Sequence, residues 1–358
     1  MDISKIDSNF VMSASFDTSG LDIYNILEEP FSIHGLMLPK DKNDVFRRLP
    51  TEVAQEVSEK VTLLHTHTSG GRVRFKTNSS SVAIFAKMRG IGRMPHFAFT
   101  GSAGFDMYVD GKFYKSEFAP PLSGMGGYSG IKVIGNRNEK SITINFPLYS
   151  EVCELLIGLD KGATLSAPEP YRYDKPIVYY GSSITQGACA SRPGNIYQAV
   201  ISRRFNVDFW NLGFSGAARG EKRIVDYISG LDMKIFVMDY DHNAYSPQHL
   251  AETHKPMFDT VRAKHPDMPI VMVTRPMFHP DGDTLRRAEV VRSTYETALK
   301  DGDKNVYFVD GMKMMRAFDE QNDGAFVDAW HPNDYGFALM AKAIGDVIGE
   351  IINKFEDN

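Results

Sequence analysis

The chain has 358 residues and a formal net charge of −5 at pH 7, with 42% hydrophobic and 24% charged residues. This composition is typical of a globular protein with room for two domains, and the slight acidic excess argues against a nucleic-acid surface. No apolar run is long enough to cross a membrane, and the first residues lack the basic and apolar regions of a signal peptide. We therefore expect a cytoplasmic protein with no membrane or nucleic-acid partner; a secreted form whose signal peptide has been removed is the alternative.

Neither a disulfide framework nor a metal site is expected. The two cysteines, Cys153 and Cys189, could form at most one bridge, and two reduced thiols in packed positions are the expectation. His65 and His67 would share one face of a strand, but no third ligand stands near them at a suitable spacing. The prediction is no metal and no cofactor.

Residues 1–170 have the period-two alternation of strands that bury one face. In the run 142–148 apolar residues alternate with polar ones, and Asp110-Gly111 stands between two β-rich runs, which predicts a hairpin with a type I′ turn. The main helical stretch expected here is 44–61. We predict a β-sandwich of jelly-roll type that ends near the proline-containing run 166–170.

Residues 171–358 alternate strands and helices instead. Apolar runs typical of buried strands stand at 176–180, 207–213, 233–240, 269–274 and 305–310. Helices are expected from Pro193 onward and at 224–231, 247–264, 284–300 and 333–355. Five strands alternating with helices predict a parallel sheet covered on both faces, with ligands bound at the carboxyl ends of the strands.

Four polar segments should converge at that edge of the sheet. They read Gly-Ser-Ser-Ile-Thr-Gln-Gly at 181–187, Asn-Leu-Gly-Phe-Ser-Gly at 211–216, Asp-Tyr-Asp-His-Asn at 239–243 and Asp-Ala-Trp-His-Pro at 328–332. The first three follow successive predicted strands, and the fourth precedes the last predicted helix. Together they offer the groups that acyl transfer needs.

A serine attacks a carbonyl only when a base takes its proton, and a carboxylate fixes the tautomer of that base. Ser183 is the candidate nucleophile, His331 the candidate base and Asp328 the candidate orienting group. Each piece also has a plainer interpretation. The serine segment could be a turn or a phosphate cradle, and Asp328 could cap a helix beside a surface histidine.

The oxyanion formed in such a reaction needs preorganised donors. The backbone N–H of Ser183, the backbone N–H of Gly216 and the side-chain amide of Asn243 are the candidates, with Gly213 as an alternative to Gly216. Asn243 could instead cap a turn. The Gly-x-Ser-x-Gly elbow of α/β-hydrolases does not occur, and Ser215 is a second candidate nucleophile.

These segments resemble the conserved blocks of the SGNH (GDSL-like) hydrolase superfamily. GSSITQG resembles the first block, whose second serine is the nucleophile, and NLGFSG resembles the second, whose last glycine is an oxyanion donor. Asn243 falls where the third block has its asparagine, and DAWHP resembles the fifth block, Asp-x-x-His-Pro. YGSSITQGACASRPG and the upstream GFDMY, at 104–108, resemble a bacterial subgroup of esterases with an N-terminal GxDLY domain.

The resemblance implies a flavodoxin-like catalytic domain over residues 171–358, an N-terminal β-sandwich over residues 1–170, and hydrolysis of a carboxylic ester. Two departures stand out: Ser182 replaces the aspartate of the first block, and Tyr240-Asp241-His242-Asn243-Ala244 replaces the Gly-x-Asn-Asp of the third. The second departure leaves the role of Asn243 open.

The expected substrate is a short acyl group such as acetyl on a carbohydrate or a similar polar alcohol. Arg192 and Arg219 could bind polar substrate groups; alternatively both are solvent-facing or salt-bridged. An acyltransferase with the same triad and a carbohydrate-binding protein with a degenerate hydrolase domain are the two alternative functions. The oligomeric state does not follow from the sequence.

Overall fold

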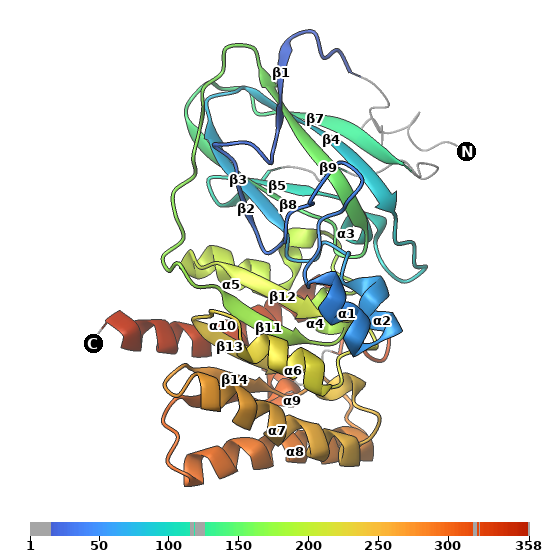
Figure 1. The fold of residues 1–358 in the computed structure, drawn as a ribbon, viewed down its shortest axis with the longest axis vertical. Helices are drawn as coiled ribbons and strands as arrows, with labels where there is room; N and C mark the ends of the chain where they lie inside the picture. Colours follow the sequence, from blue (N-terminus) through green and yellow to red (C-terminus); the bar gives the residue numbers. More distant parts are fainter. Residues whose placement is uncertain (1–15, 115–117, 119–125, 318–320, 322, 357–358) are drawn as a thin grey trace.

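The computed structural model describes residues 16–114, 118, 126–317, 321 and 323–356. Two antiparallel sheets form the N-terminal part, and one five-stranded parallel sheet with its helices forms the C-terminal part. In Figure 1 the antiparallel sheets lie at one end of the long axis and the layers of the parallel sheet and its helices follow beneath them. The predicted fold class, an α/β domain preceded by a β-sandwich, is confirmed.

The N-terminal sheets pack face to face around one apolar core. One sheet has the strand order β1-β9-β4-β7 and the other β10-β3-β8-β5-β6, with β2 paired to β3. Alternate side chains such as Phe75, Ile84, Ile144 and Ile157 are buried between the sheets, because successive residues of a strand point to opposite faces. The strands are β1 (Leu21–Asn25), β2 (Ser32–His34), β3 (Arg72–Thr77), β4 (Ser81–Gly90), β5 (Asp106–Val109), β6 (Lys112–Phe113), β7 (Gly127–Val133), β8 (Lys140–Asn145), β9 (Glu151–Asp160) and β10 (Leu165–Ser166).

Two local predictions for this part had different outcomes. Asp110 and Gly111 connect β5 to β6 with φ values of 49° and 75°, as a type I′ turn requires, so the hairpin is confirmed. The helix expected over 44–61 is instead two short helices, α1 (Thr51–Val57) and α2 (Glu59–Leu64). Ser58 causes the break, because its extended backbone ends α1 while its side chain caps α2.

The C-terminal sheet has the order β12-β11-β13-β14-β15, which is the flavodoxin-like order. All five expected strands are present: β11 (Ile177–Gly181), β12 (Phe209–Gly213), β13 (Ile235–Asp239), β14 (Ile270–Val273) and β15 (Val306–Val309). Ile177 and Tyr179 of β11 are buried in the apolar core on one face of the sheet, whereas Val178 and Tyr180 are buried in the apolar core on the other face. Both faces of the sheet are therefore covered.

The helices of this part agree with the expected ones except at three places. They are α4 (Ser183–Gln186), α5 (Tyr197–Phe205), α6 (Lys222–Ser229), α7 (Pro247–Lys264), α8 (Gly282–Lys300), α9 (Gly311–Arg316) and α10 (Asp334–Glu356). The helix expected from Pro193 is a 3₁₀ turn, η3 (Pro193–Asn195), that Ile196, in extended conformation, separates from α5. The helices α4, α9 and, in the N-terminal part, α3 (Phe99–Ser102) were not predicted, because such short helices show no periodicity. None of the helices described is long and apolar enough to cross a bilayer.

Arg48 joins the N-terminal part to the parallel sheet. Its fully buried guanidinium donates hydrogen bonds to the carbonyl oxygens of Asn211 (3.0 Å) and Gly213 (2.6 Å) in β12. It also donates to the carbonyl oxygens of Leu64 (2.8 Å), the last residue of α2, and His67 (2.7 Å), which follows that helix. One cation thus fixes the end of β12, from which residues 214–216 lead into the site described below.

Arg48→Met should lower the free energy of unfolding by at least about 3 kcal/mol, because four carbonyl oxygens lose their donor in a buried place. Arg137→Met is the control, since the Arg137 side chain is 60% exposed and lies 3.8 Å from Asp160. Urea denaturation of the two variants and the wild type measures the difference. Equal midpoints for both variants would mean that Arg48 does not hold the two parts together.

Candidate active site

Ser183 is the first residue of α4, directly after the central strand β11 and its neighbour Ser182. The Ser182 hydroxyl accepts a hydrogen bond from the N–H of Ile184 (3.2 Å) and so caps the helix. Serine and aspartate are both good N-caps, which explains why a serine can stand where the first block usually has an aspartate. The N–H of Ser183 has no intrahelical acceptor at this position and is available to a ligand.

His331 connects Ser183 to Asp328. Ser183 Oγ lies 3.0 Å from His331 Nε2, and His331 Nδ1 lies 2.8 Å from Asp328 Oδ2. The other carboxylate oxygen, Oδ1, accepts the N–H groups of Trp330 (2.7 Å) and His331 (2.8 Å). Partial burial opposes the ionisation of Asp328, but these hydrogen bonds lower its pKa to about 2. The structure thus brings the three predicted side chains into one hydrogen-bonded line.

The loop that carries Asp328 and His331 has its own support. The N–H of Val327 donates to the carbonyl oxygen of His331 (2.9 Å), which closes the loop on itself. Asn333 Oδ1 accepts the N–H groups of Tyr335 (3.0 Å) and Gly336 (3.2 Å) and caps α10. Because Asn333 fills the cap position, the alternative in which Asp328 merely caps the last helix is wrong.

The backbone of Gly216, not that of Gly213, is open to the site. The N–H of Gly213 donates to Asn211 Oδ1 (2.8 Å), and a Cβ there would lie 2.2 Å from the backbone nitrogen of Gln186. Gly216 has a φ of 65° and open space where a Cβ would stand, and it lines the same hollow as Ser183. Of the two glycines, only Gly216 can offer its N–H to a ligand bound at Ser183.

Asn243 ends the 3₁₀ turn η4 (Asp241–Asn243) and also lines the hollow. Arg287 holds this turn, since its guanidinium donates to the carbonyl oxygens of Asp241 (2.9 Å) and Ala244 (2.8 Å). Asp241 Oδ2 in turn accepts the N–H of Arg275 (3.0 Å). Oδ1 of Asn243 is buried and has no hydrogen-bond partner among the described residues. The turn therefore places the side chain of Asn243 in the lining of the hollow despite its departure from the usual third block.

The hollow has a volume of about 460 Å³ and a mainly polar lining. Besides the candidate residues already placed, several charged or aromatic side chains that the sequence analysis did not identify contribute to it. The lining residues are Ser183, Ser215, Gly216, His242, Asn243, Arg275, Asp283, Arg287, Trp330 and His331. Arg275 and Arg287 could not be identified from the sequence, because a single arginine after a strand or within a helix is typical of an ordinary surface residue.

Gln186 is a further residue that the sequence analysis quoted but did not assign. Its Oε1 accepts the N–H of Ser215 (3.0 Å), and its Nε2 lies 3.2 Å from His67 Nδ1. This buried amide fixes the loop that carries Gly216 against the helix that carries Ser183. The relative position of the N–H groups of Ser183 and Gly216, two of the candidate oxyanion donors, therefore depends on Gln186.

Ser215 and Cys189 do not compete with Ser183 as nucleophiles. Among the described residues the Ser215 side chain has no hydrogen bond to an imidazole, and the phenol of Tyr149 lies near its hydroxyl. Cys189 is unbridged and nearly buried, and this burial raises the pKa of its thiol to about 12. Both groups therefore lack the base or the low pKa that nucleophilic attack requires.

Arg192 does not line the hollow, contrary to the expectation that it could bind substrate. Its guanidinium donates to Asp106 Oδ2 (3.1 Å) and to the Tyr108 hydroxyl (2.6 Å). Asp106 Oδ2 also accepts the N–H of Gly194 (2.8 Å), and Oδ1 accepts the side-chain amide of Asn145 (2.7 Å). Arg192 is thus salt-bridged, and the GFDMY motif supplies the carboxylate and phenol that hold the turn after the nucleophile helix.

Arg219 lies at the border of the site. Its guanidinium donates to the carbonyl oxygen of Gly216 (3.3 Å) and to the Tyr245 hydroxyl (2.5 Å), and it stacks 4.0 Å from the centre of the Tyr245 ring. It is not among the side chains that line the hollow. Arg219 therefore helps to hold the Gly216 backbone in place through this hydrogen bond. Binding of substrate by Arg219 stays a prediction.

The sequence of the chain matches two family models that follow one another. Residues 174–349 match the GDSL-like Lipase/Acylhydrolase family. Residues 18–165 match the GxDLY family, described as the N-terminus of Esterase_SGNH_hydro-type. No curated protein matches the chain.

Several solved structures have the same fold over most of the chain. A Bacteroides ovatus protein described as a GDSL-like lipase is 28% identical, with a TM-score of 0.80 over 93% of this chain and 98% of that one. The salicylyl-acyltransferase SsfX3 from a tetracycline biosynthetic pathway is 21% identical, with a TM-score of 0.75 over 91% and 96%. A family two carbohydrate esterase from Clostridium thermocellum, in complex with cellohexaose, is 20% identical, with a TM-score of 0.60 over 80% and 94%. The last two establish a shared fold only.

Asp328→Asn should lower kcat by about two to four orders of magnitude with little change in melting temperature, because an amide can hold the wrong tautomer of His331. The matched control is Asp323→Asn. Asp323 also lies beside a histidine, with Oδ2 3.2 Å from His279 Nε2, but both side chains are largely exposed. Steady-state kinetics and thermal melts of both variants test this expectation. Near-wild-type turnover of folded Asp328→Asn would show that Asp328 does not orient the base.

The pH profile should report one ionisation that is needed for activity. The imidazole that takes the Ser183 proton must be unprotonated, so kcat/KM should fall as the assay pH is lowered from about 8 to 5. Asp328, with a pKa of about 2, and His242, whose pKa burial lowers to about 3, cannot cause this change. His242→Gln should therefore keep the same acidic limb. A flat profile across this range would be incompatible with a histidine base.

Proposed function

We propose that this protein, which belongs to the GDSL-like lipase/acylhydrolase family, hydrolyses esters of a short acyl group, such as acetyl, with a carbohydrate or similar polar alcohol. The observation that carries the proposal is the hydrogen-bonded line from Ser183 Oγ through both nitrogens of His331 to Asp328. A serine, a base and a carboxylate in this order are the arrangement that activates a hydroxyl for attack on a carbonyl.

In the proposed reaction, His331 Nε2 takes the proton of Ser183 Oγ while Oγ forms a bond to the ester carbonyl carbon. The carbonyl oxygen becomes an oxyanion, which the N–H groups of Ser183 and Gly216 and the Asn243 amide stabilise. The imidazolium then gives its proton to the alcohol oxygen as the ester C–O bond breaks. Water, deprotonated by His331 in the same way, attacks the carbonyl carbon of the acyl-enzyme. The bond from that carbon to Ser183 Oγ then breaks, the acid leaves, and the imidazolium returns its proton to Oγ. Asp328 keeps the Nδ1 proton in place throughout.

The lining of the hollow supports a polar alcohol. Arg275 and His242 each have a buried side-chain nitrogen without a hydrogen-bond partner among the described residues, and both line the hollow. Buried polar groups of this kind favour a ligand that hydrogen-bonds to them. Trp330, which is 40% exposed, adds a flat apolar ring beside His331. Hydroxyl groups on a ring-shaped alcohol would satisfy the first two residues and stack on the third.

A neighbouring groove allows the acyl part of the proposal to be tested. The groove has a volume of about 390 Å³, is lined by apolar side chains that include Leu63, Leu64, Met94 and Tyr149, and meets the hollow at Ser215. A longer acyl chain could pack against these apolar side chains, whereas an acetyl group is too short to use the groove. A graded series of p-nitrophenyl esters therefore decides between short and long acyl groups, and a preference for long chains would contradict this part of the proposal.

Ser183→Ala should lower the hydrolysis of acetylated sugars and of p-nitrophenyl acetate by at least about three orders of magnitude without unfolding the protein. Ser215→Ala, in the same hollow, is the control and should retain most of the activity. Product analysis with an added alcohol separates the two enzymatic alternatives, because an acyltransferase would form a new ester instead of free acid. Wild-type protein that binds acetylated sugar but releases no acid would instead support the binding-protein alternative.

A further inference from the structure

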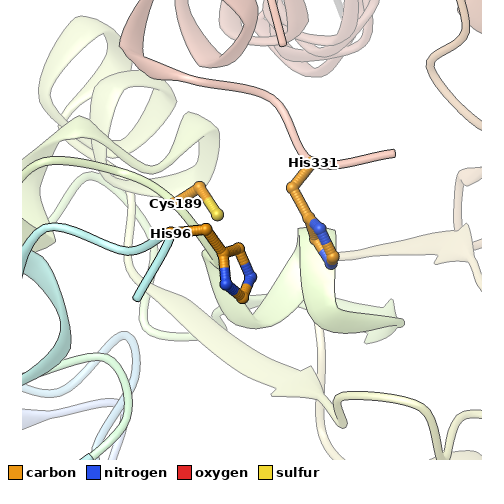
Figure 2. A group of neighbouring side chains, drawn as sticks. All are labelled: His96, Cys189 and His331. Atoms are coloured by element: carbon orange, nitrogen blue, oxygen red, sulfur yellow. The ribbon is translucent and has the colours of Figure 1, made fainter. Parts of the chain in front are cut away.

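His96, Cys189 and His331 form a group of possible metal ligands beside Ser183. One ligand atom from each residue lies within 4.8 Å of the others, and this is the one such group found among the described residues. Figure 2 shows the side chains of His96 and Cys189 next to each other and facing His331. His65 and His67, the pair considered from the sequence, follow α2 and are not part of a strand or of this group.

The three residues come from different parts of the fold. His96 lies in the loop between β4 and α3 of the N-terminal part and is exposed, so that an ion can reach it from solvent. Cys189 follows α4, and its thiol is the softest ligand of the three. The ring centres of His96 and His331 lie 5.8 Å apart. One thiolate and two imidazoles with an open fourth position are a ligand set typical of Zn²⁺.

Asp328 already orients His331 as metal-bound histidines are usually oriented. Its carboxylate accepts the Nδ1 proton of His331 at 2.8 Å, which leaves Nε2 as the ligand atom. Zinc–nitrogen and zinc–sulfur bonds of about 2.0 and 2.3 Å place tetrahedral ligands roughly 3.5 Å apart, so the group must contract by about 1 Å. The exposed loop that carries His96 can supply this movement.

We propose that His96, Cys189 and His331 bind Zn²⁺ and that the bound ion inhibits the enzyme reversibly. On binding, the Cys189 thiol releases its proton and forms a Zn–S bond, while His96 and His331 Nε2 bind through lone pairs. The lone pair of Nε2 is then unavailable to the proton of Ser183, whose Oγ lies 3.0 Å away in the free enzyme. The inhibitory effect rests on the proposed function; the metal site itself does not.

The test compares Zn²⁺ inhibition of ester hydrolysis in the wild type, Cys189→Ala and His96→Gln. Neither residue takes part in the proposed reaction, so kcat/KM without zinc should stay within about twofold of the wild-type value. The zinc concentration for half inhibition should rise by at least about tenfold in each variant, and EDTA should restore full wild-type activity. Cys153→Ala and His279→Gln are the controls, because they remove the other cysteine and another exposed histidine.

Isothermal calorimetry with Zn²⁺ and the absorption of the Co²⁺-loaded protein give a readout that needs no activity. The wild type should bind one ion and show a cobalt–thiolate band, which Cys189→Ala should lack. This measurement keeps its meaning even if no ester is hydrolysed, so a failed metal site and a failed esterase proposal can be told apart. Unchanged zinc inhibition in both variants, or no binding by the wild type, would overturn the proposal.

Discussion

The hydrogen bond between Ser183 Oγ and His331 Nε2 joins segments that lie 148 residues apart in the chain, and the candidate site exists only because the fold holds them together. Next to it, Asp334 at the start of α10 accepts hydrogen bonds from the N–H and the hydroxyl of Ser191, which follows the nucleophile helix. Asn333 fixes the first turn of α10 at the same place. The position of the base relative to the nucleophile therefore depends on the docking of α10, whose apolar face is buried against α5 and the sheet.

The N-terminal sandwich supports this geometry from the other side. Asp106 holds the turn of residues 192–194 through a salt bridge and a backbone hydrogen bond, and Arg48 holds the end of β12 through its carbonyl oxygens. His67, which follows α2, lies against Gln186 and so against the loop of Gly216. The N-terminal part thus holds segments that carry the site, although it contributes none of the described residues that line the hollow, and this support is a physical reason for the two parts to occur in one chain.

Much of the fold and the candidate triad could be predicted from local sequence patterns. The buried strands are short apolar runs, and Ser183, Asp328 and His331 stand in segments whose order along an α/β chain already places them at one edge of the sheet. What could not be predicted depends on distant partners. Arg192 looked like a substrate ligand because its partner Asp106 lies 86 residues earlier.

Two further predictions depended on backbone hydrogen bonds and dihedral angles that the sequence does not show. The choice between Gly213 and Gly216 required knowing which N–H is already bonded, and the helix over 44–61 broke at Ser58 because a serine in extended conformation can end one helix and cap the next. Arg275 and Arg287 became candidates only when the structure placed them in the lining of the hollow. Such residues act through tertiary contacts, and single-sequence patterns carry no record of those contacts.

If Ser183 is the nucleophile, its hydroxyl carries the acyl group during turnover. Rapid acid quenching of a reaction with p-nitrophenyl acetate, followed by peptide mass spectrometry, locates the covalent intermediate directly. We expect a burst of p-nitrophenol and an acetyl group on the peptide that contains Ser183, with neither in Ser183→Ala. An acetyl group found on another residue during productive turnover, or undiminished turnover by Ser183→Ala, would contradict it.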